Sequence, residues 1–461
     1  MEAKNARLLF CLEASMENKK TLPLIIKMSI PPALSMLIQC LYNLVDSIYI
    51  TRYDSLAMEA ISLVYPIQNI ILAIGLGIGI GINAYVAMKM GEGRQNKAEN
   101  GATLGVLLSI IHYVIVVAVG LLVSNIFIRS FTDKEAVVSY ATTYINIIII
   151  FSFTTIVQIA LEKILQADGK MMLPMISLIT GSIINIVLDP ILIFTFDMGI
   201  LGAAIATVVG QVAATIIMIY FILSKRNRIR LSLKGLKMDK ACLKAIYMVG
   251  IPSIILTAIP SIMVSLMNYI LVGLNDNAVT TFGIYYKLQY FVYMAVSGIS
   301  QGTMPMISYF YGANNKGKLK ETVNDSIILS GIIGLVSMVI FLAIPDLIMS
   351  MFYDDLANMG YYSSLLRIAS LSFIFGSINY FLASYFQAVQ CGFRSLMVAV
   401  LRQFILILPI AFILSQYKGE EGVYIAIPTS EILTLIITSF IFIFEYKNRL
   451  KAMDDKIFTQ S

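Results

Sequence analysis

The amino-acid sequence predicts an all-α membrane protein of twelve transmembrane helices, arranged as two six-helix lobes related by a pseudo-two-fold repeat. The composition indicates a membrane protein, because 58% of the 461 residues are hydrophobic and 13% are charged, against about 45–50% and about 25% in soluble domains. The hydrophobic residues form long blocks without polar alternation, which favours helices over a transmembrane barrel. In addition, the two halves of the chain share sequence features at a constant spacing.

Twelve apolar blocks are each long enough to cross about 30 Å of hydrocarbon as a helix. Two of them, 57–88 and 279–310, exceed the length of a straight crossing, so we expect those helices to tilt or to protrude. The predicted spans are 24–50, 57–88, 102–128, 137–165, 172–195, 200–223, 246–273, 279–310, 326–348, 361–388, 396–416 and 423–445.

Lysine and arginine residues gather in alternate connections between the spans, which predicts the orientation of the chain. The most basic connection is also the longest polar linker, and it separates two groups of six spans. Both termini fall on the basic side and are predicted to be cytoplasmic. The predicted parts are an N-terminal tail 1–21, an N-lobe 22–224, a cytoplasmic linker 225–245, a C-lobe 246–446 and a C-terminal tail 447–461.

The two halves of the chain are predicted to be copies of one another. Three pairs of matching residues are each separated by 221 positions. Because each half has an even number of spans, the copies insert in the same direction, and a binding site is expected between them. The three pairs are Pro31 with Pro252, Gln166 with Gln387, and Gly91 with Gly312.

The sequence contains no motif that indicates an enzyme. The phosphate-binding pattern G-x-x-x-x-G-K-[ST] is absent, and the alternating glycines at 75–81 lie inside an apolar span, where they favour close helix packing. The single histidine, His112, has no neighbouring metal ligands in the sequence. The net charge of +6 comes from basic residues in the connections, so we do not expect nucleic-acid binding. The four cysteines, Cys11, Cys40, Cys242 and Cys391, have neither metal nor disulfide spacing and are expected to be free thiols.

Acidic residues inside apolar spans are the most informative functional signal. Asp46 lies in the first span with Gln39 and Asn43 at i−7 and i−3, so all three share one helical face. An ionised carboxylate at that depth costs several kcal/mol, and such residues usually face a protein cavity and mark an ion path. A purely structural role, in which the aspartate only pairs or caps, is the alternative.

Asp189 is the second such acid. It lies in the fifth span, with Asn185 at i−4 on its own face and with Pro190 directly after it. The proline frees a backbone carbonyl one turn earlier and favours bending of this helix. Two close carboxylates cannot comfortably both be ionised in a low-dielectric site, so we expect the pair to bind a proton or to hold a Na⁺ ion.

Other polar residues within the spans are candidates either for a substrate cavity or for helix–helix contacts, since threonine and glutamine stripes often only join helices. On the fourth span, Tyr144, Thr155, Gln158 and Glu162 are predicted to share one face. The full set of candidates of this kind is Gln39, Asn43, Gln158, Glu162, Gln211, Lys287, Gln301, Arg402 and Glu431.

The second half differs from the first in its charged residues. Under the repeat, Asp46 aligns near Asn268 and Asp189 near Ile410, so both acids are lost. The second half instead keeps Lys287, Arg402 and Glu431 within spans. An ion pair among these residues is at least as well supported as a role in transport.

These segments resemble the MATE (multidrug and toxic compound extrusion) family from about residue 22 to residue 446. The resemblance is carried by "NLVDSIYITR" at 43–52, "LQADGKMMLPM" at 165–175, "NIVLDPILIF" at 185–194 and "SQGTMPMISYFYGANN" at 300–315. It is strongest to the bacterial branch that includes DNA-damage-inducible and staphylococcal-type multidrug pumps. It implies twelve helices in two lobes and export of drugs coupled to entry of H⁺ or Na⁺.

The resemblance also implies a site in the N-lobe. The family's cation-coupling residues fall on Asp46, Tyr144, Asn185, Asp189 and Thr207, and Na⁺ would be held by these residues without Tyr144. Another branch of the family uses acids in the seventh, eighth or tenth helix, and those spans contain none here, so a C-lobe cation site of that kind is not expected.

The expected partners are small-molecule drugs and membrane lipids. We expect no cofactor besides the coupling ion, a monomer, and a multi-pass location in a bacterial cytoplasmic (inner) membrane. The alternative function is a flippase for lipid-linked saccharides. It would need a cationic cavity for pyrophosphate, which only Lys287 and Arg402 could supply from within the spans.

Overall fold

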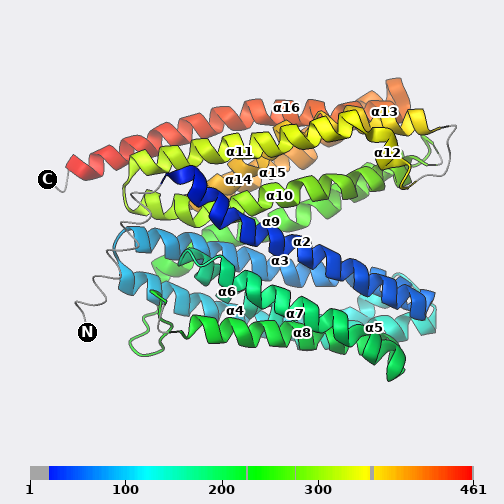
Figure 1. Ribbon diagram of the computed structural model, residues 1–461, viewed down its shortest axis with the longest axis horizontal. Helices are drawn as coiled ribbons and strands as arrows, with labels where there is room; N and C mark the ends of the chain where they lie inside the picture. The colour runs from blue at the N-terminus through cyan, green and yellow to red at the C-terminus, as the bar shows by residue number, and fades with distance from the viewer. Residues whose placement is uncertain (1–19, 225–226, 276, 353–357, 459–461) are drawn as a thin grey trace. The chain divides into compact units, whose positions relative to one another are not determined.

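The computed structural model describes residues 20–224, 227–275, 277–352 and 358–458, and all regular secondary structure in these ranges is helical (Figure 1). The helices of the first half are α2 (Thr21–Tyr53), α3 (Ser55–Gly91), α4 (Gln95–Arg129), α5 (Glu135–Ile150), α6 (Phe153–Ala167), α7 (Met172–Pro190), the π-helical η1 (Ile191–Thr195) and α8 (Gly199–Ile222). Those of the second half are α9 (Lys240–Leu271), α10 (Ala278–Gly312), α11 (Lys316–Ala343), α12 (Pro345–Met349), α13 (Met359–Ser370), α14 (Phe373–Ala388), α15 (Gly392–Val400), the π-helical η2 (Leu401–Leu406) and α16 (Ile407–Phe458).

Each of the twelve predicted spans coincides with a helix or with consecutive helices. Nine described helical segments are long and apolar enough to cross a membrane on their own, and the bent pair α5–α6 makes a tenth. The predicted span 279–310 coincides with α10, which is not among these segments. The twelfth arises because the segment 392–454 contains two spans, separated where Gly419 (φ 58°, ψ −135°) leaves the helical conformation within α16. Glycine tolerates this left-handed φ, which other residues rarely adopt.

Several helices begin earlier than their apolar blocks predicted. α4 begins at Gln95 instead of 102, and α11 begins at Lys316 instead of 326. Polar residues can continue a helix beyond the hydrocarbon, and a capped first turn stabilises such an extension at α11 but not at α4, which has no side-chain cap. At α11, the Asn315 side chain accepts a hydrogen bond of 3.0 Å from the Lys318 backbone N–H.

The described helices form two compact units, which we describe separately. The N-unit comprises residues 34–258 and 390–396, and the C-unit comprises the remaining described residues. The limits of the units fall inside α2, just after Pro31 and Pro32, and inside α9, just before Pro260. Each of these two helices therefore contributes its first part to one unit and its second part to the other. The lobe limits drawn from the sequence remain a prediction.

The alternating glycines of α3 serve close packing inside the N-unit, as the sequence indicated. A Cβ atom at Gly79 would lie 2.9 Å from the Ile159 side chain of α6. A Cβ atom at Gly77, on the opposite side of α3, would lie 2.7 Å from the Gly250 carbonyl oxygen of α9. Only a residue without a side chain lets two helix backbones approach this closely.

The described part of the basic linker is bound to the N-unit. The Asn100 amide of α4 donates to the Lys237 carbonyl at 3.0 Å, and the Lys237 backbone N–H donates back to the Asn100 side chain at 2.9 Å. The Ser232 N–H donates to the Thr103 hydroxyl at 3.3 Å. These bonds hold the linker backbone against α4. The tail 1–19 and linker residues 225–226 lie outside the described residues.

The cysteine prediction is confirmed for the three described residues, Cys40, Cys242 and Cys391, which are free thiols; Cys11 lies outside the described ranges. The His112 ring makes a contact of 2.8 Å between its Nδ1 and the Leu108 carbonyl oxygen. Within the described residues, no group of three or more histidine, cysteine, aspartate or glutamate side chains is arranged to hold a metal ion.

The glycine contact between α3 and α9 leads to a stability prediction. Gly77→Ala should destabilise the protein by about 1–3 kcal/mol, because the new Cβ would have to displace the α9 backbone or the Ile254 side chain. Thermal unfolding of the detergent-solubilised protein measures this effect. Gly283→Ala in α10 is the matched control, since a Cβ there meets nothing within 4 Å. Equal melting temperatures for the two variants would contradict the packing argument.

Candidate functional site

Five polar residues from four helices come together inside the N-unit, and they are the five that the sequence singled out for cation coupling. Asp46 lies on α2, Tyr144 on α5, Asn185 and Asp189 on α7, and Thr207 on α8. Asp189 is completely buried, Asn185 and Tyr144 are nearly so, and Asp46 is half-buried. Four separate helices therefore converge on one polar site in an otherwise apolar bundle.

The two carboxylates occupy the same site. Asp46 and Asp189 lie close enough for their negative charges to interact. The Asn185 amide donates a hydrogen bond of 3.3 Å to Asp189 Oδ1. In the described part of the chain, no basic side chain forms an ion pair with either acid. A second ionised carboxylate in this position would therefore face a like charge without compensation.

Three buried oxygen atoms of the site have no hydrogen-bond partner among the described residues. They are Asp46 Oδ1, Asn185 Oδ1 and Asp189 Oδ2. Buried polar atoms are nearly always satisfied, and leaving one unsatisfied costs about 1–3 kcal/mol, more when it is charged. Three acceptors without donors fit a bound proton shared by the acids, or a hard cation that prefers carboxylate and amide oxygens.

Two tyrosines and an amide complete the surroundings of the acids. The Tyr144 hydroxyl accepts a hydrogen bond of 3.3 Å from the Gln68 amide of α3 and lies within hydrogen-bonding reach of Thr207. Tyr42, one turn before Asp46 on α2, lies near both acids and near Gln39. The sequence analysis did not identify Tyr42 or Gln68. The i−4 spacing of Tyr42 from Asp46 was the signal that could have found it.

α7 changes its helical geometry immediately after the site. It ends at Pro190 and continues as the π-helical turn Ile191–Thr195. Proline has no N–H to donate to the carbonyl one turn earlier, and single π-helical turns inside α-helices are frequent at functional sites. Asp189 therefore lies at the point where the backbone hydrogen bonding of this helix changes.

A contact between two glycines holds α7 against α8 beside the site. A Cβ atom at Gly210 would lie 2.6 Å from the Gly181 carbonyl oxygen and 3.1 Å from the Asn185 Cβ. Gly181 lies one turn before Asn185, and Gly210 lies about one turn after Thr207. Absence of side chains at these two positions thus allows the α7 and α8 residues of the site to approach each other.

The remaining candidates of the first half belong to helix contacts away from the acids. The hydroxyl of Thr154 donates to Gln211 Oε1 at 2.8 Å, and the hydroxyl of Thr215 donates to Gln158 Oε1 at 3.3 Å, so these residues join α6 to α8. Glu162 pairs with Lys163, with 3.1 Å between Oε1 and Nζ.

The prediction that Tyr144 shares one helical face with Thr155, Gln158 and Glu162 is wrong, because Tyr144 lies on α5 and the other three lie on α6. The predicted span is bent by 41° between α5 and α6. At the break, the Thr154 hydroxyl oxygen lies 2.7 Å from the Phe151 carbonyl oxygen, which is therefore an alternative acceptor to Gln211 for its one proton. Such local side-chain bonds compete with helical hydrogen bonding.

The two remaining candidates of the first half, Asn43 and Gln39, are exposed on α2.

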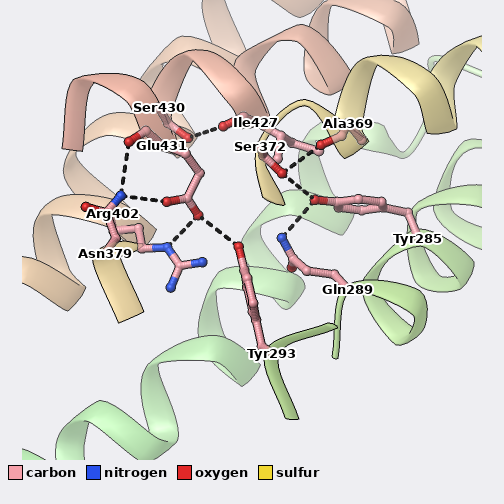
Figure 2. Close-up of polar contacts among 10 residues, drawn as sticks. All are labelled: Tyr285, Gln289, Tyr293, Ala369, Ser372, Asn379, Arg402, Ile427, Ser430 and Glu431. Atoms are coloured by element: carbon pink, nitrogen blue, oxygen red, sulfur yellow. Dashed lines mark hydrogen bonds and ion pairs between the residues drawn. The ribbon is translucent and has the colours of Figure 1, made fainter. Parts of the chain in front are cut away.

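A second polar cluster lies in the C-unit around a buried ion pair (Figure 2). Arg402 Nε of η2 lies 2.5 Å from Glu431 Oε1 of α16, and the side chains are 13% and 5% exposed. The Asn379 amide of α14 donates to the Glu431 carbonyl and to its Oε2, both at 3.0 Å. The Tyr293 hydroxyl of α10 donates to Glu431 Oε1 at 3.5 Å, and the Arg402 guanidinium lies 5.0 Å from the centre of the Tyr293 ring.

This cluster confirms that Arg402 and Glu431 form an ion pair, one of the two roles that the sequence left open. Lys287 is exposed on α10 and does not contribute to this pair. The Gln301 amide donates to the Ser297 hydroxyl within α10 at 3.4 Å.

Comparison with known proteins gives a consistent result. The profile of the MatE family matches the chain twice, at residues 31–191 and 252–413. The two matches begin 221 residues apart, which confirms the internal repeat. Multidrug export protein MepA of Staphylococcus aureus (strain bovine RF122 / ET3-1) is 24% identical over 414 residues, which are 90% of this chain and 91% of that protein. The MepA protein of Staphylococcus haemolyticus (strain JCSC1435) is 24% identical over 423 residues, covering 92% and 93% of the two chains.

Solved structures show the same fold. An outward-facing multidrug resistance MATE family transporter of the MOP superfamily superposes with a TM-score of 0.89 at 24% identity, over 96% of this chain and 98% of the other. A MOP superfamily transporter from Pyrococcus furiosus, described as having a binding pocket of reverse polarity, gives a TM-score of 0.88 at 24% identity, over 96% and 98%.

The glycine contact beside the acids leads to a second prediction. Gly210→Ala should push α8 away from α7 and cost about 1–3 kcal/mol of stability. If a cation binds at these acids, the variant should also show a smaller increase in melting temperature on addition of that cation. Gly331→Ala on α11 is the control, because its Cβ would meet only ordinary contacts at 3.7 Å or more. An undiminished response to cations in Gly210→Ala would show that the contact does not position the site.

Proposed function

Because the chain belongs to the MatE family, we propose that it is a secondary active transporter that exports amphipathic, often cationic, small molecules in exchange for H⁺ or Na⁺ by alternating access. The proposal rests on the observation that two close acids in the N-unit have no basic partner among the described residues and leave three acceptor oxygens unsatisfied there. The names of the relatives, which are multidrug export proteins, support the substrate class.

In the proposed mechanism, the acids of the N-unit exchange one cation for another. A proton or Na⁺ on Asp46 and Asp189 relieves the repulsion between them. Na⁺ would be held by these two carboxylates, the Asn185 amide oxygen and the Thr207 hydroxyl. A cationic drug that approaches the acids competes with that ion for the same negative charge. Binding of the ion and binding of the drug therefore exclude each other, which is the condition for exchange.

The change in α7 after Asp189 suggests how the two states could differ in shape. The segment that follows Pro190 is a π-helical turn, and such turns are frequent at functional sites. Sharp bends of helices are found mainly at prolines and at π-helical turns. We propose that α7 bends at this turn as the acids gain or lose their cation.

The flippase alternative receives little support from the charged residues. It requires positive charge for pyrophosphate, and the charge of Arg402 is already neutralised by Glu431 at 2.5 Å. Of the two basic residues that could bind pyrophosphate from within the spans, only Lys287 remains available. We further propose a monomer in the cytoplasmic membrane with both termini inside and no cofactor besides the coupling ion.

Removal of either titratable charge tests the coupling site. Asp46→Asn and Asp189→Asn keep the size and much of the hydrogen bonding of each residue. Each should reduce gradient-driven efflux at least about 100-fold, while the protein still inserts and folds, because an amide cannot bind a coupling proton and binds Na⁺ weakly. Drug uptake into inside-out vesicles, under a pH gradient or a Na⁺ gradient in turn, measures this and distinguishes the two ions.

The matched control is Asp346→Asn, which removes an exposed acid on α12 and should leave transport unchanged. If either site variant exports drug at the wild-type rate with the same dependence on pH and Na⁺, that residue is not part of the coupling site. Wild-type vesicles that accumulate no drug under either gradient would refute antiport itself.

The proposed orientation is tested by cysteine labelling in a variant without natural cysteines. Leu233 in the linker is 72% exposed, so Leu233→Cys should react with a membrane-impermeant maleimide in inside-out vesicles but not in intact cells. Asp133→Cys, in the connection between α4 and α5, should show the opposite pattern. Reaction of Leu233→Cys in intact cells would reverse the proposed topology.

A further inference from the structure

The buried ion pair of the C-unit joins the two helical segments that correspond, in the repeat, to α7 and α8 of the N-unit. Gly199 and Gly202 of α8 match Gly419 and Gly422 of α16 at a spacing of 220 residues, so Glu431 falls at the place of Gln211, next to Gly210. In the N-unit, glycines bring the two backbones together, with a Cβ at Gly210 only 2.6 Å from the Gly181 carbonyl oxygen. In the C-unit, η2 and α16 carry opposite charges 2.5 Å apart.

The amide side chain that contacts Glu431 also has a counterpart in the first copy of the repeat. Asn379, which donates two hydrogen bonds to Glu431, lies 221 residues after Gln158, whose side chain accepts from Thr215. The neutral network of amides and hydroxyls in the first copy thus corresponds to a charged network in the second. Besides lacking the two acids of the first copy, the second copy has gained one buried acid together with one buried base.

The two units therefore balance buried negative charge by different means. In the N-unit, Asp46 and Asp189 have no basic partner within the described residues. In the C-unit, Glu431 has the guanidinium of Arg402 in direct contact. A guanidinium remains protonated in proteins at any physiological pH, and its planar donors fit a carboxylate. Arg402 is consequently a permanent positive charge that cannot leave the site.

We propose that Arg402 is a tethered counter-ion that does for Glu431 what a coupling ion does for the acids of the N-unit, so that the C-unit keeps one charge state throughout the export cycle. This inference rests on the proposed function and extends it. It predicts that all cation exchange occurs in the N-unit. It also predicts that loss of Arg402 alone turns Glu431 into a new cation-binding group.

Other groups around Glu431 do not offer a competing counter-charge. Tyr293 and Tyr285 face it from α10, and Asn379 faces it from α14. Tyr293 also stacks on Tyr380 of α14, with ring centres 6.2 Å apart. The two phenols facing Glu431 are neutral at physiological pH, and the amide does not titrate. Arg402 is the residue on which the charge state of Glu431 depends.

The first test measures protonated carboxyl groups and does not require transport. Infrared spectra of the purified protein in lipid are compared as the pH is lowered from alkaline to mildly acidic. Arg402→Gln should add the protonated-carboxyl signal of one group relative to the wild type, and the double variant Arg402→Gln/Glu431→Gln should lose that added signal. If folded Arg402→Gln shows the same carboxyl signal as the wild type, the proposal is overturned.

The second test measures the number of coupling cations that move per exported drug molecule in proteoliposomes. Arg402→Gln should raise this ratio by about one, and the double variant should return it to the wild-type value. A ratio lower than wild type in the double variant would show that Glu431 is itself a coupling group, which also overturns the proposal. The control Arg367→Gln removes an exposed arginine whose contact to Asp346 is 3.9 Å, and it should change neither measurement.

The double variant allows the proposal to be tested even if Arg402→Gln alone misfolds. A buried acid left without its base is strongly destabilising, whereas replacing both partners by neutral groups of similar shape is often tolerated. If Arg402→Gln does not fold, the double variant still decides between an unchanged ratio, as proposed, and a reduced one. If the wild type shows no gradient-driven export, the proposed function fails, and the infrared comparison alone then judges the role of Arg402.

Discussion

A carboxylate inside a helix bundle that crosses a membrane must share its site with a proton or with a positive charge. Hydrocarbon offers no water to solvate it, and the helices around it have already used their backbone groups in their own hydrogen bonds. Both units of this protein contain such carboxylates. The N-unit buries Asp189 and half-buries Asp46 with oxygens left unsatisfied, whereas the C-unit buries Glu431 against Arg402.

The position of each acid depends on how closely the neighbouring helices approach. In the N-unit, glycines at 181 and 210 let α7 and α8 touch through their backbones beside Asn185. In the C-unit, η2 and α16 meet through the side chains of Arg402 and Glu431. A helix pair without side chains at its contact can bring ligands from two helices to one ion.

The two copies of the repeat illustrate how one architecture can separate two tasks. Both copies keep the matched prolines, Pro31 and Pro252, and both match the family profile. In α2 and in α9, the limit between the compact units lies a few residues after the matched proline. The charged side chains have diverged, whereas both copies keep the same all-helical architecture apart from local breaks such as that between α11 and α12. Fold and repeat therefore belong to the shared backbone pattern, whereas the chemistry belongs to a few substituted positions.

The sequence by itself determined the number of spans, the repeat and the identity of the two acids with their amide neighbour. These features follow from the length of apolar blocks, from constant spacing and from i−4 periodicity, all of which are local along the chain. Only the tertiary structure decided that α5 and α6 meet at a bend of 41°, that Gln68 and Tyr42 reach the site, and that Arg402 pairs with Glu431 and not Lys287. Contacts between helices distant in the sequence depend on how those helices pack, and no spacing along one helix specifies which faces meet.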